Sequence, residues 1–437
     1  MNLNLVSKMR FTIESLGCKV NIYEAEAVAY LLKQRGYIQV TDNPDVQIIN
    51  TCTVTQTSDS KSRKLIRSKI KENPNAITVV MGCYSQLSSE EAFSIPGVNI
   101  VIGTNNRSHI YELIEEYRLF RKNVNLVSNA LEYKTFENLC LNELSIHTRG
   151  FVKIQDGCEN FCTYCAIPYA RGPIKSRDPE SVITEINALV THGVKEVILA
   201  GINTGTYGKD INNLNLAKLI EKIVLETKIK RLRLSSIELM EITDELLDTI
   251  EKYQDVVCNH LHIPLQSACD ETLKRMNRKY NMTEYISRIE EIRKRFPDIA
   301  ITMDCLAGFV GETIEEFETT CENIKNINFA FGHIFPYSIR PNTVASKLKG
   351  HLDPKVIKER AKILINIQKE NTRNYLNKFI GQEVEVLFEQ KKNNYWYGHT
   401  TNYLEVFMED QGIDLTNEIK KIKLLKVENE SILGKEI

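Results

Sequence analysis

Three cysteines, Cys158, Cys162 and Cys165, lie in one short run of the chain with the spacing C-x3-C-x2-C. Thiolates at such short spacings are the ligands that iron–sulfur clusters select. A [4Fe–4S] cube has four iron corners, so a loop with three thiolates leaves one iron without a protein ligand. An iron of this kind can bind and reduce a small molecule as well as pass electrons. The spacing therefore predicts a reactive cluster.

Two other interpretations of these cysteines compete with a cluster. A structural zinc site usually takes four ligands from two C-x2-C pairs, and no second pair occurs in the chain. Free cysteines can also be buried as small hydrophobic residues. Both alternatives are weaker, because neither accounts for three cysteines at this spacing.

Composition limits the class of protein. The chain has 437 residues, of which 42% are hydrophobic and 26% charged, as expected of a water-soluble protein with two to four domains. Residues 1–10 lack the apolar segment of a secretory signal, and no apolar run is long enough to span a membrane. Eleven cysteines without a secretion signal predict a cytoplasmic location and thiols that bind metal. The net charge of −1 means that any nucleic-acid binding must use local basic patches.

The first part of the chain, from about residue 10 to 125, alternates strand-like and helix-like segments. This alternation predicts a doubly wound parallel α/β sheet. The expected strands are 10–18, 45–54, 76–84 and 99–104, and the expected helices are 23–35, 58–71, 88–93 and 107–120.

A second set of three cysteines lies at equivalent places in this part. Cys18, Cys52 and Cys83, about 30 residues apart, each lie at the end of an expected strand and before its helix. The carboxyl ends of parallel strands meet at one crevice, where ligands bind. The pattern therefore predicts that the three thiols are neighbours in space.

A second strand–helix series follows a weakly patterned linker that contains Cys140. Its roughly six βα units are fewer than the eight that close a full barrel, which predicts an open, partial barrel. The loop of Cys158 follows the first of its strands, on the face where such barrels place chemistry. A long helix, 354–378, is expected to end this part. The expected strands are 151–155, 196–202, 231–236, 260–264, 300–306 and 330–335, and the expected helices are 179–192, 216–227, 244–253, 270–276, 283–296 and 314–327.

The last part of the chain changes to short alternating strands at 383–388, 396–399, 403–407 and 421–427. This pattern predicts a small all-β barrel, a common nucleic-acid-binding shape. From Asn371 to Ile437 there are nine Lys or Arg and eleven Asp or Glu, so the barrel is not basic.

The order of these parts and several motifs resemble the methylthiotransferase family of radical S-adenosylmethionine (SAM) enzymes. By this resemblance the domains are an N-terminal methylthiotransferase domain (9–125), a linker (126–146), a radical SAM partial barrel (147–375) and a TRAM-like β-barrel (376–437). The motifs are Ser15-Leu-Gly-Cys-Lys-Val-Asn21, Asn50-Thr-Cys-Thr-Val54, Gly82-Cys-Tyr84, Gln155-Asp-Gly-Cys-Glu-Asn-Phe-Cys-Thr-Tyr-Cys-Ala-Ile-Pro168, His262-Ile-Pro-Leu-Gln-Ser267 and Phe335-Pro-Tyr-Ser-Ile-Arg340.

The resemblance implies the cofactors and the reaction. The open iron of the cluster at Cys158, Cys162 and Cys165 would bind SAM and cleave it to a 5′-deoxyadenosyl radical. Cys18, Cys52 and Cys83 would hold a second, auxiliary [4Fe–4S] cluster, and a second SAM would methylate a sulfur there. Replacing an aromatic C–H by C–S–CH3 requires such cofactors, because no acid–base side chain can remove that hydrogen.

The residues after Cys18 resemble one branch of this family. Gly-Cys-Lys-Val-Asn resembles the corresponding sequence in the branch that acts on N6-threonylcarbamoyladenosine in tRNA. That adenosine is at position 37, next to the anticodon, and the product is its C2-methylthio derivative. Isopentenyladenosine enzymes usually have Gly-Cys-Gln-Met-Asn, and enzymes for a ribosomal-protein aspartate have Gly-Cys-Pro-Lys-Asn. The chain departs from the family where Val310 replaces a proline and where Asn342 replaces a glycine.

Polar and small residues at the barrel's strand ends are candidates to contact SAM. Ser, Asn and Gln offer hydrogen bonds, and glycine allows close backbone approach. Tyr164 could stack near the adenine or pack against the cluster. The remaining candidates are Gly201, Asn203, Ser235, Ser236 and Gln266.

A basic helix follows Cys52 and is a candidate to grip tRNA phosphates with Lys61, Arg63, Lys64 and Arg67. Such a run is often only a solvated helix face, but this one has no acid before Glu72. The expected partners are therefore the tRNA anticodon stem-loop and an electron donor such as flavodoxin or ferredoxin. In the last part Tyr395, Trp396, Tyr397 and Tyr403 could stack on bases or fill the barrel core.

Two alternatives to this function remain. One is a sibling methylthiotransferase that acts on isopentenyladenosine in tRNA or on a ribosomal-protein aspartate. The other is a non-enzymatic two-cluster electron carrier, which the incomplete ligand sets argue against because carriers saturate their iron. The pattern assigns no role to Cys140, Cys258, Cys269, Cys305 or Cys321.

Overall fold

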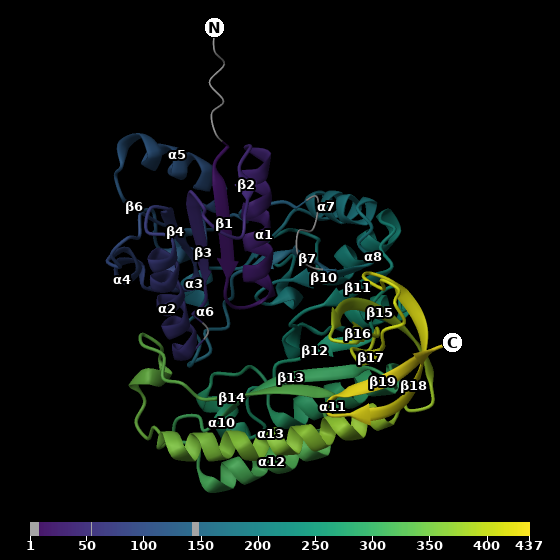
Figure 1. Cartoon of the computed structure of the whole chain (residues 1–437). Coiled ribbons are helices and arrows are strands. Elements are labelled where there is room, and N and C mark those ends of the chain that lie inside the picture. The colour runs from purple at the N-terminus through teal and green to yellow at the C-terminus, as the bar shows by residue number, and fades with distance from the viewer. Residues whose placement is uncertain (1–7, 54, 142–147) are drawn as a thin grey trace.

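The computed structural model describes residues 8–53, 55–141 and 148–437. Figure 1 shows an α/β part at the N-terminus, a larger α/β part beneath and beside it, and a small β part at the C-terminal end.

The N-terminal part is a six-stranded sheet in the order β2-β1-β3-β4-β5-β6, with parallel pairing throughout. Every residue of β3 and β4 is buried, as expected of strands covered on both faces. The strands are β1 (Arg10–Ser15), β2 (Ile38–Gln39), β3 (Val46–Thr51), β4 (Ile77–Gly82), β5 (Ile100–Val101) and β6 (Val124–Asn125). The helices are α1 (Lys19–Gln34), α2 (Gln56–Glu72), α3 (Cys83–Leu87), α4 (Ser89–Phe93) and α5 (Ile110–Phe120), with the 3-10 turn η1 (Arg107–His109).

Helices cover both faces of this sheet, which confirms the doubly wound prediction. Ile48 of β3 packs in one core with residues of α1 and α5. Its neighbour Ile49 packs in a second core with Ile66 of α2 and Ala92 of α4. Successive side chains of a strand point to opposite faces, so one apolar run serves both cores.

Residues 126–141, which sequence analysis interprets as part of a linker, pack against the rest of the protein. They include the 3-10 turn η2 (Ala130–Glu132). Leu139 and Leu141 are buried in the core that contains α1 and α5. The remainder of the predicted linker, 142–146, lies outside the described residues.

The central part contains six parallel strands in an open arc. They form the three-stranded sheets β11-β10-β7 and β12-β13-β14, which isolated bridges join at Leu232–Val257 and Ser236–His262. The arc has two free edges, β7 and β14, as the partial barrel requires. The strands are β7 (Gly150–Lys153), β10 (Glu196–Ala200), β11 (Arg231–Leu234), β12 (His260–His262), β13 (Ala300–Ala307) and β14 (Phe331–Pro336).

Helices cover the outside of the arc through a large aliphatic core. Two short strands, β8 (Gln155–Asp156) and β9 (Lys175–Ser176), pair antiparallel at the two ends of the segment that contains Cys158, Cys162 and Cys165. The sequence pattern did not predict this pair. The helices are α6 (Ile167–Arg171), α7 (Pro179–Thr191), α8 (Leu216–Glu226), α9 (Asp244–Lys252), α10 (Asp270–Arg275), α11 (Met282–Arg295), α12 (Ile314–Ile327) and α13 (Pro354–Asn377), with the 3-10 turns η3 (Thr204–Thr206), η4 (Leu239–Glu241) and η5 (Ala345–Lys347).

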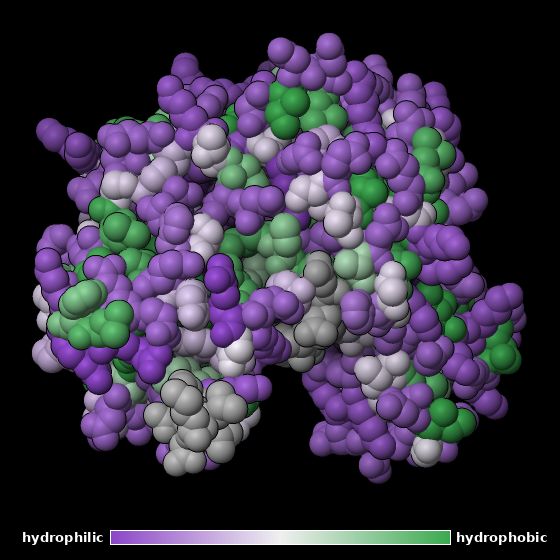
Figure 2. Space-filling model, turned by 90° about the horizontal axis from the view of Figure 1, so that it is seen from above, coloured by the Kyte–Doolittle hydropathy of each residue, from purple (hydrophilic) through white to green (hydrophobic). Residues whose placement is uncertain are grey.

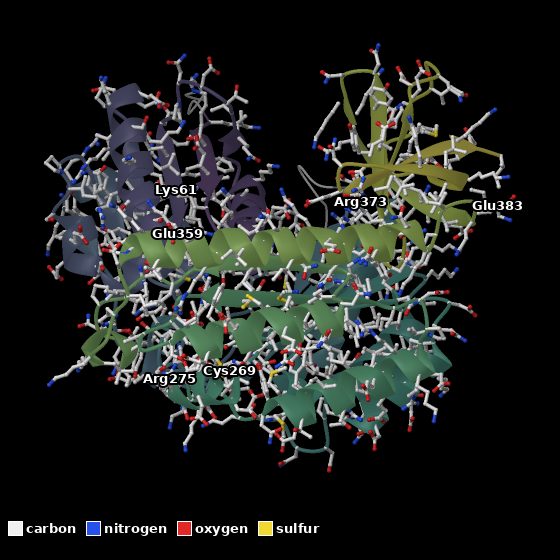
Figure 3. All side chains as sticks on the ribbon, turned by 90° about the horizontal axis from the view of Figure 1, so that it is seen from below. Lys61, Cys269, Arg275, Glu359, Arg373 and Glu383 are labelled. Carbon is white, nitrogen blue, oxygen red and sulfur yellow. The ribbon has the colours of Figure 1, made fainter. Side chains whose placement is uncertain are left out.

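Helix α13 connects the three parts of the molecule. Figure 3 shows it running from the side of the N-terminal part, where Lys61 is labelled, to the C-terminal strands, where Glu383 is labelled. It packs on β13 and β14, and its last residues, with Tyr375 and Leu376, join the core of the C-terminal barrel.

The C-terminal strands form a closed barrel in the order β15-β16-β17-β19-β18. The prediction of an all-β barrel is confirmed, but the last strand, β19, was not among the predicted strands. Arg231 and Arg233 of β11 donate hydrogen bonds to backbone carbonyls of this barrel and so attach it to the central arc. The strands are β15 (Glu383–Lys392), β16 (Tyr395–His399), β17 (Glu405–Glu409), β18 (Ile419–Glu428) and β19 (Ser431–Glu436).

The face of the molecule in Figure 2 is mostly hydrophilic, with hydrophobic residues in small separate groups. Among the described residues, no helix combines the length and the apolar character needed to cross a membrane.

Candidate active site with two cysteine triads

The three N-terminal cysteines come together as the strand–helix pattern predicts. Cys18 precedes α1, Cys52 follows β3, and Cys83 is the first residue of α3. The side chain of Asn21 lies between two of them, because its Oδ1 is 4.0 Å from the sulfur of Cys18 and 3.9 Å from that of Cys83. We call Cys18, Cys52 and Cys83 the distributed triad.

A glycine is required beside this triad. Gly17 has φ of +110°, and a Cβ placed there would lie 2.9 Å from the sulfur of Cys52. Only glycine combines this backbone conformation with so close an approach. The Gly-Cys pair of the first motif therefore has a direct packing reason.

A buried arginine contacts the distributed triad from the other domain. Arg171 of α6 places Nε and Nη2 each 3.2 Å from the sulfur of Cys83. Its guanidinium also donates to Glu24 at 2.5 Å and to Asn21 at 2.8 Å. Because Arg171 lies six residues after Cys165 in the chain, it connects the two sets of cysteines.

Opposite charges surround Arg171 and compensate its burial. Glu24 pairs with Arg171, Lys153 and Arg107, and all four side chains are buried. Burial raises the pKa of Glu24, but the three cations outweigh that effect and lower its pKa to about 2. Glu24 is therefore ionised, and the network is held together by charge-assisted hydrogen bonds.

The chemistry of the distributed triad fits a cluster better than free thiols. Burial raises the pKa of Cys83 to about 12, although Arg171 acts in the opposite direction. A bound metal provides the positive charge that lets such thiols ionise. Within the described ranges no group of three or more His, Cys, Asp or Glu side chains is arranged to hold a metal ion. A cluster is wider than one ion, so its cysteines attach at separate corners.

Cys158, Cys162 and Cys165, which we call the local triad, lie in a loop fixed by backbone hydrogen bonds. Cys158 N–H donates to the carbonyl of Gly172 at 3.1 Å. Thr163 N–H donates to Met276 at 3.0 Å, and the Thr163 carbonyl accepts from Ala345 at 2.8 Å. Burial raises the pKa of Cys165 to about 12 and that of Cys158 to about 11. This donor set also fits a cluster, for the same reason as the distributed triad.

An arginine also contacts the local triad. Arg278 Nη1 lies 3.4 Å from the sulfur of Cys162 and 3.1 Å from the carboxylate of Glu238. Its other nitrogens reach the hydroxyl of Tyr280 and the carbonyl of Pro264.

Each triad thus has an arginine guanidinium within hydrogen-bond distance of one sulfur, a feature that sequence analysis missed. The close sequence position of Arg171 to Cys165 is a signal that could have found the first donor.

The residues expected to contact SAM lie where the first four strands of the arc end. The amide Nδ2 of Asn203 and the hydroxyl of Ser235 are buried and have no hydrogen-bond partner among the described residues, so each can bond a ligand. A Cβ at Gly201 would lie 3.0 Å from Gln155 Oε1, so a side chain there would crowd the strand end. These features fit a polar ligand lying across the strand ends.

The other three SAM candidates have structural roles in the arc. Ser236 accepts at its carbonyl from Thr204 and forms the bridge to His262. Gln266 has φ of +66° and bridges to Cys305 through its backbone. Tyr164 packs edge-on against Phe309, with 6.3 Å between ring centroids. SAM contact by these residues stays a prediction.

The expected tRNA-binding residues on α2 divide into two kinds. Lys61, Lys64 and Arg67 are exposed, whereas Arg63 is half-buried and pairs with Glu91 at 3.4 Å. The N-cap of this helix is Thr55, whose hydroxyl accepts from Ser58 N–H.

The C-terminal aromatic residues are used mainly inside the protein. Trp396 is buried in the barrel core. Tyr403 stacks on His260 of the central arc, with 4.7 Å between ring centroids. Tyr397 stacks on Phe407, and Tyr395 remains partly exposed.

The two triads belong to domains that match known families. Residues 152–324 match the radical SAM superfamily, and residues 10–103 match the uncharacterized protein family UPF0004. The fold is similar to that of the radical SAM methyltransferase TsrM from Kitasatospora setae, with a TM-score of 0.57 and 14% identity over 78% of this chain and 74% of that one. The match at residues 152–324 identifies the central part as a radical SAM domain, and members of that superfamily use SAM and a [4Fe–4S] cluster.

Curated relatives match nearly the whole chain. It is 42% identical over 420 residues to the threonylcarbamoyladenosine tRNA methylthiotransferase of Bacillus subtilis, covering 94% of this chain and 93% of the relative. It is 34% identical to the enzyme of that name from Thermotoga maritima, covering 97% and 96%. A tRNA-2-methylthio-N(6)-dimethylallyladenosine synthase of Clostridium botulinum is 32% identical and covers 100% and 98%. The chain belongs to the tRNA methylthiotransferase family of radical SAM enzymes, which are SAM-dependent transferases with tRNA as substrate.

Proposed function

We propose that the protein inserts a methylthio group at C2 of N6-threonylcarbamoyladenosine at position 37 of tRNA. The observation that supports this proposal is the contact of Arg171 with Cys83, because Arg171 follows the local triad by six residues and so brings that part of the chain against the distributed triad. The Gly-Cys-Lys-Val-Asn sequence and the names of the most similar relatives support the threonylcarbamoyl substrate.

We assign one [4Fe–4S] cluster to each triad, with SAM at the strand ends of the arc. When bound, the clusters and SAM supply the radical and the methylthio group. The chain's own residues hold these groups and orient them. The two triads ligate iron, while Asn203 and Ser235 are available for hydrogen bonds to SAM. Arg171 and Arg278 each donate to a sulfur and fix the position of a cysteine.

The proposed partners are the tRNA anticodon stem-loop and a reduced flavodoxin or ferredoxin. Helix α2 begins beside Cys18 and Cys52, so phosphates bound by its exposed cations would place position 37 near the distributed triad. SAM cleavage consumes an electron, which requires an external donor.

A sibling activity on isopentenyladenosine is the second candidate, since the relative from Clostridium botulinum is named for that substrate. Nucleoside mass spectrometry of tRNA from a strain that lacks the gene separates the two. We expect the methylthio-threonylcarbamoyl nucleoside to disappear and the methylthio-isopentenyl nucleoside to stay. If the threonylcarbamoyl product persists in a strain without a second such enzyme, the proposed substrate is wrong.

A further inference from the structure

A groove of about 760 Å³ opens beside the distributed triad. Cys18 and Cys52 lie at one side of it, and the chain that leaves β14 lies at the other. The first residues of α2 and of α13 complete its walls. Phe335, Tyr337, Ile339, His351 and Lys358 are among its lining residues. We call this cavity the Tyr337 groove.

Two rings in the groove carry polar atoms that nothing else in the described protein uses. Tyr337 is 7% exposed, and its buried hydroxyl has no hydrogen-bond partner among the described residues. Both ring nitrogens of His351 are also buried and have no hydrogen-bond partner among the described residues. The two rings are parallel, with centroids 6.1 Å apart. Burying such groups without partners costs free energy, which a ligand would recover.

The other features of the groove define the ligand further. Phe335 and Ile339 are 39% and 44% exposed, so apolar surface lies at its mouth. Lys358 adds an exposed cation at the start of α13. Apolar side chains together with hydrogen-bonding groups and a cation suit an aromatic base that carries a polar, anionic substituent.

We propose that the Tyr337 groove binds the N6-threonylcarbamoyl substituent of the substrate adenosine. In this arrangement Tyr337 and His351 bond the urea and carboxylate oxygens, and Lys358 provides the opposite charge. This inference rests on the proposed function, and it names residues that select the substrate.

The geometry of adenine supports this placement. C2 and the carbon that bears N6 both adjoin N1, so they lie on one edge of the base. A base that enters the groove by this edge can direct C2 toward Cys18 and Cys52. The substituent on N6 then lies against the other wall, where Tyr337 and His351 are.

The position of α2 favours RNA as the occupant. Thr55, Thr57 and Ser58, at its beginning, line the groove, and the exposed Lys61 and Lys64 follow within two turns. A tRNA backbone held by these cations would pass the entrance of the groove.

The test is binding of two anticodon stem-loop RNAs to the anaerobic holoenzyme without reductant. One RNA carries N6-threonylcarbamoyladenosine at position 37, and the other carries adenosine there. Tyr337→Phe and His351→Phe keep a ring but remove the hydrogen-bonding atoms. Tyr375→Phe, which removes a hydroxyl that bonds Asp298, is the matched control. Iron content and thermal melting show that each variant folds and holds its clusters.

We expect Tyr337→Phe and His351→Phe each to weaken binding of the modified RNA by roughly 2- to 10-fold and to leave the adenosine RNA unchanged. The control should change neither affinity. If both groove variants keep the wild-type preference, or weaken the two RNAs equally, the inference is overturned. Failure of the proposed function looks different, because the wild-type enzyme would then form no product from the modified RNA when reductant is added.

Discussion

The two triads each bring three cysteine side chains together, but the chain assembles them in different ways. The local triad lies in one loop, and backbone hydrogen bonds to Gly172, Met276 and Ala345 fix that loop. The distributed triad takes one cysteine from each of three strand–helix connections, so its geometry depends on the whole parallel sheet. The first can be recognised from spacing alone, whereas the second exists only because the fold brings distant residues together.

The surroundings of the triads differ as well. The distributed triad borders the Tyr337 groove, whereas the lining of that groove includes none of the local cysteines. Arg171, at the distributed triad, belongs to a fully buried charge network that joins two domains. Arg278, at the local triad, pairs with Glu238, whose side chain is 20% exposed. Because the distributed triad borders the groove, we infer that it meets the substrate and that the local triad generates the radical.

Replacing one cysteine of either triad should have the largest effect on activity, and the two variants should lose different steps of the reaction. Cys162→Ala should abolish cleavage of SAM to 5′-deoxyadenosine, because the local cluster loses a ligand. Cys52→Ala should keep cleavage but form no methylthio product. Chromatography of both products under anaerobic, reducing conditions measures this. Equal loss of 5′-deoxyadenosine in the two variants would contradict the division of tasks.

The arginines should differ in their effect on stability. Arg171→Met leaves Glu24 and Asp156 buried with less compensation, and we expect unfolding free energy to fall by about 3–5 kcal/mol. Arg278→Met should cost less, because solvent reaches Glu238. Urea denaturation of the two metal-free variants checks this order. If Arg278→Met lowered the unfolding free energy more than Arg171→Met, the contacts of the local triad would contribute more to stability than the buried charges between the domains.

The same arginines should tune their clusters separately. Hydrogen bonds and positive charge near cluster sulfur raise the reduction potential. Arg278→Gln should therefore lower the potential of the local cluster and leave the other unchanged. Redox titration followed by electron paramagnetic resonance gives both potentials. A shift of both clusters, or of neither, would contradict a local action of Arg278.

The smallest expected effect concerns the helix beside the distributed triad. Arg67→Gln should weaken tRNA binding and reduce the salt dependence, as the slope of log K against log salt, by about 1. Arg63→Gln should change the slope less, because Arg63 already pairs with Glu91. Fluorescence titrations at several salt concentrations measure the slopes. Equal slopes for the wild type and Arg67→Gln would exclude a phosphate contact there.

Sequence patterns predicted much of this fold because its strands and helices alternate with strong periodicity. Helix α12 begins and ends at the predicted residues, and the strand-end positions of Cys18, Cys52 and Cys83 predicted their proximity. Short edge elements such as β2 and β6, of two residues each, carry no such pattern.

The supporting residues of the site could not be predicted in this way. Arg171 touches Cys83 across 88 positions of sequence, and Tyr337 becomes a groove residue only when the chain that leaves β14 lies opposite Cys18 and Cys52. Both depend on how the domains pack, which periodicity within a segment does not describe.

The central claim is that each triad holds its own cluster, and iron analysis tests it most directly. The anaerobically reconstituted wild-type protein should contain about eight iron atoms per chain, four for each [4Fe–4S] cluster. Replacing Cys18, Cys52 and Cys83 by alanine should leave about four, and replacing Cys158, Cys162 and Cys165 should also leave about four. About four iron atoms in the wild type, with none left after one of the replacements and no change after the other, would contradict the two-cluster account.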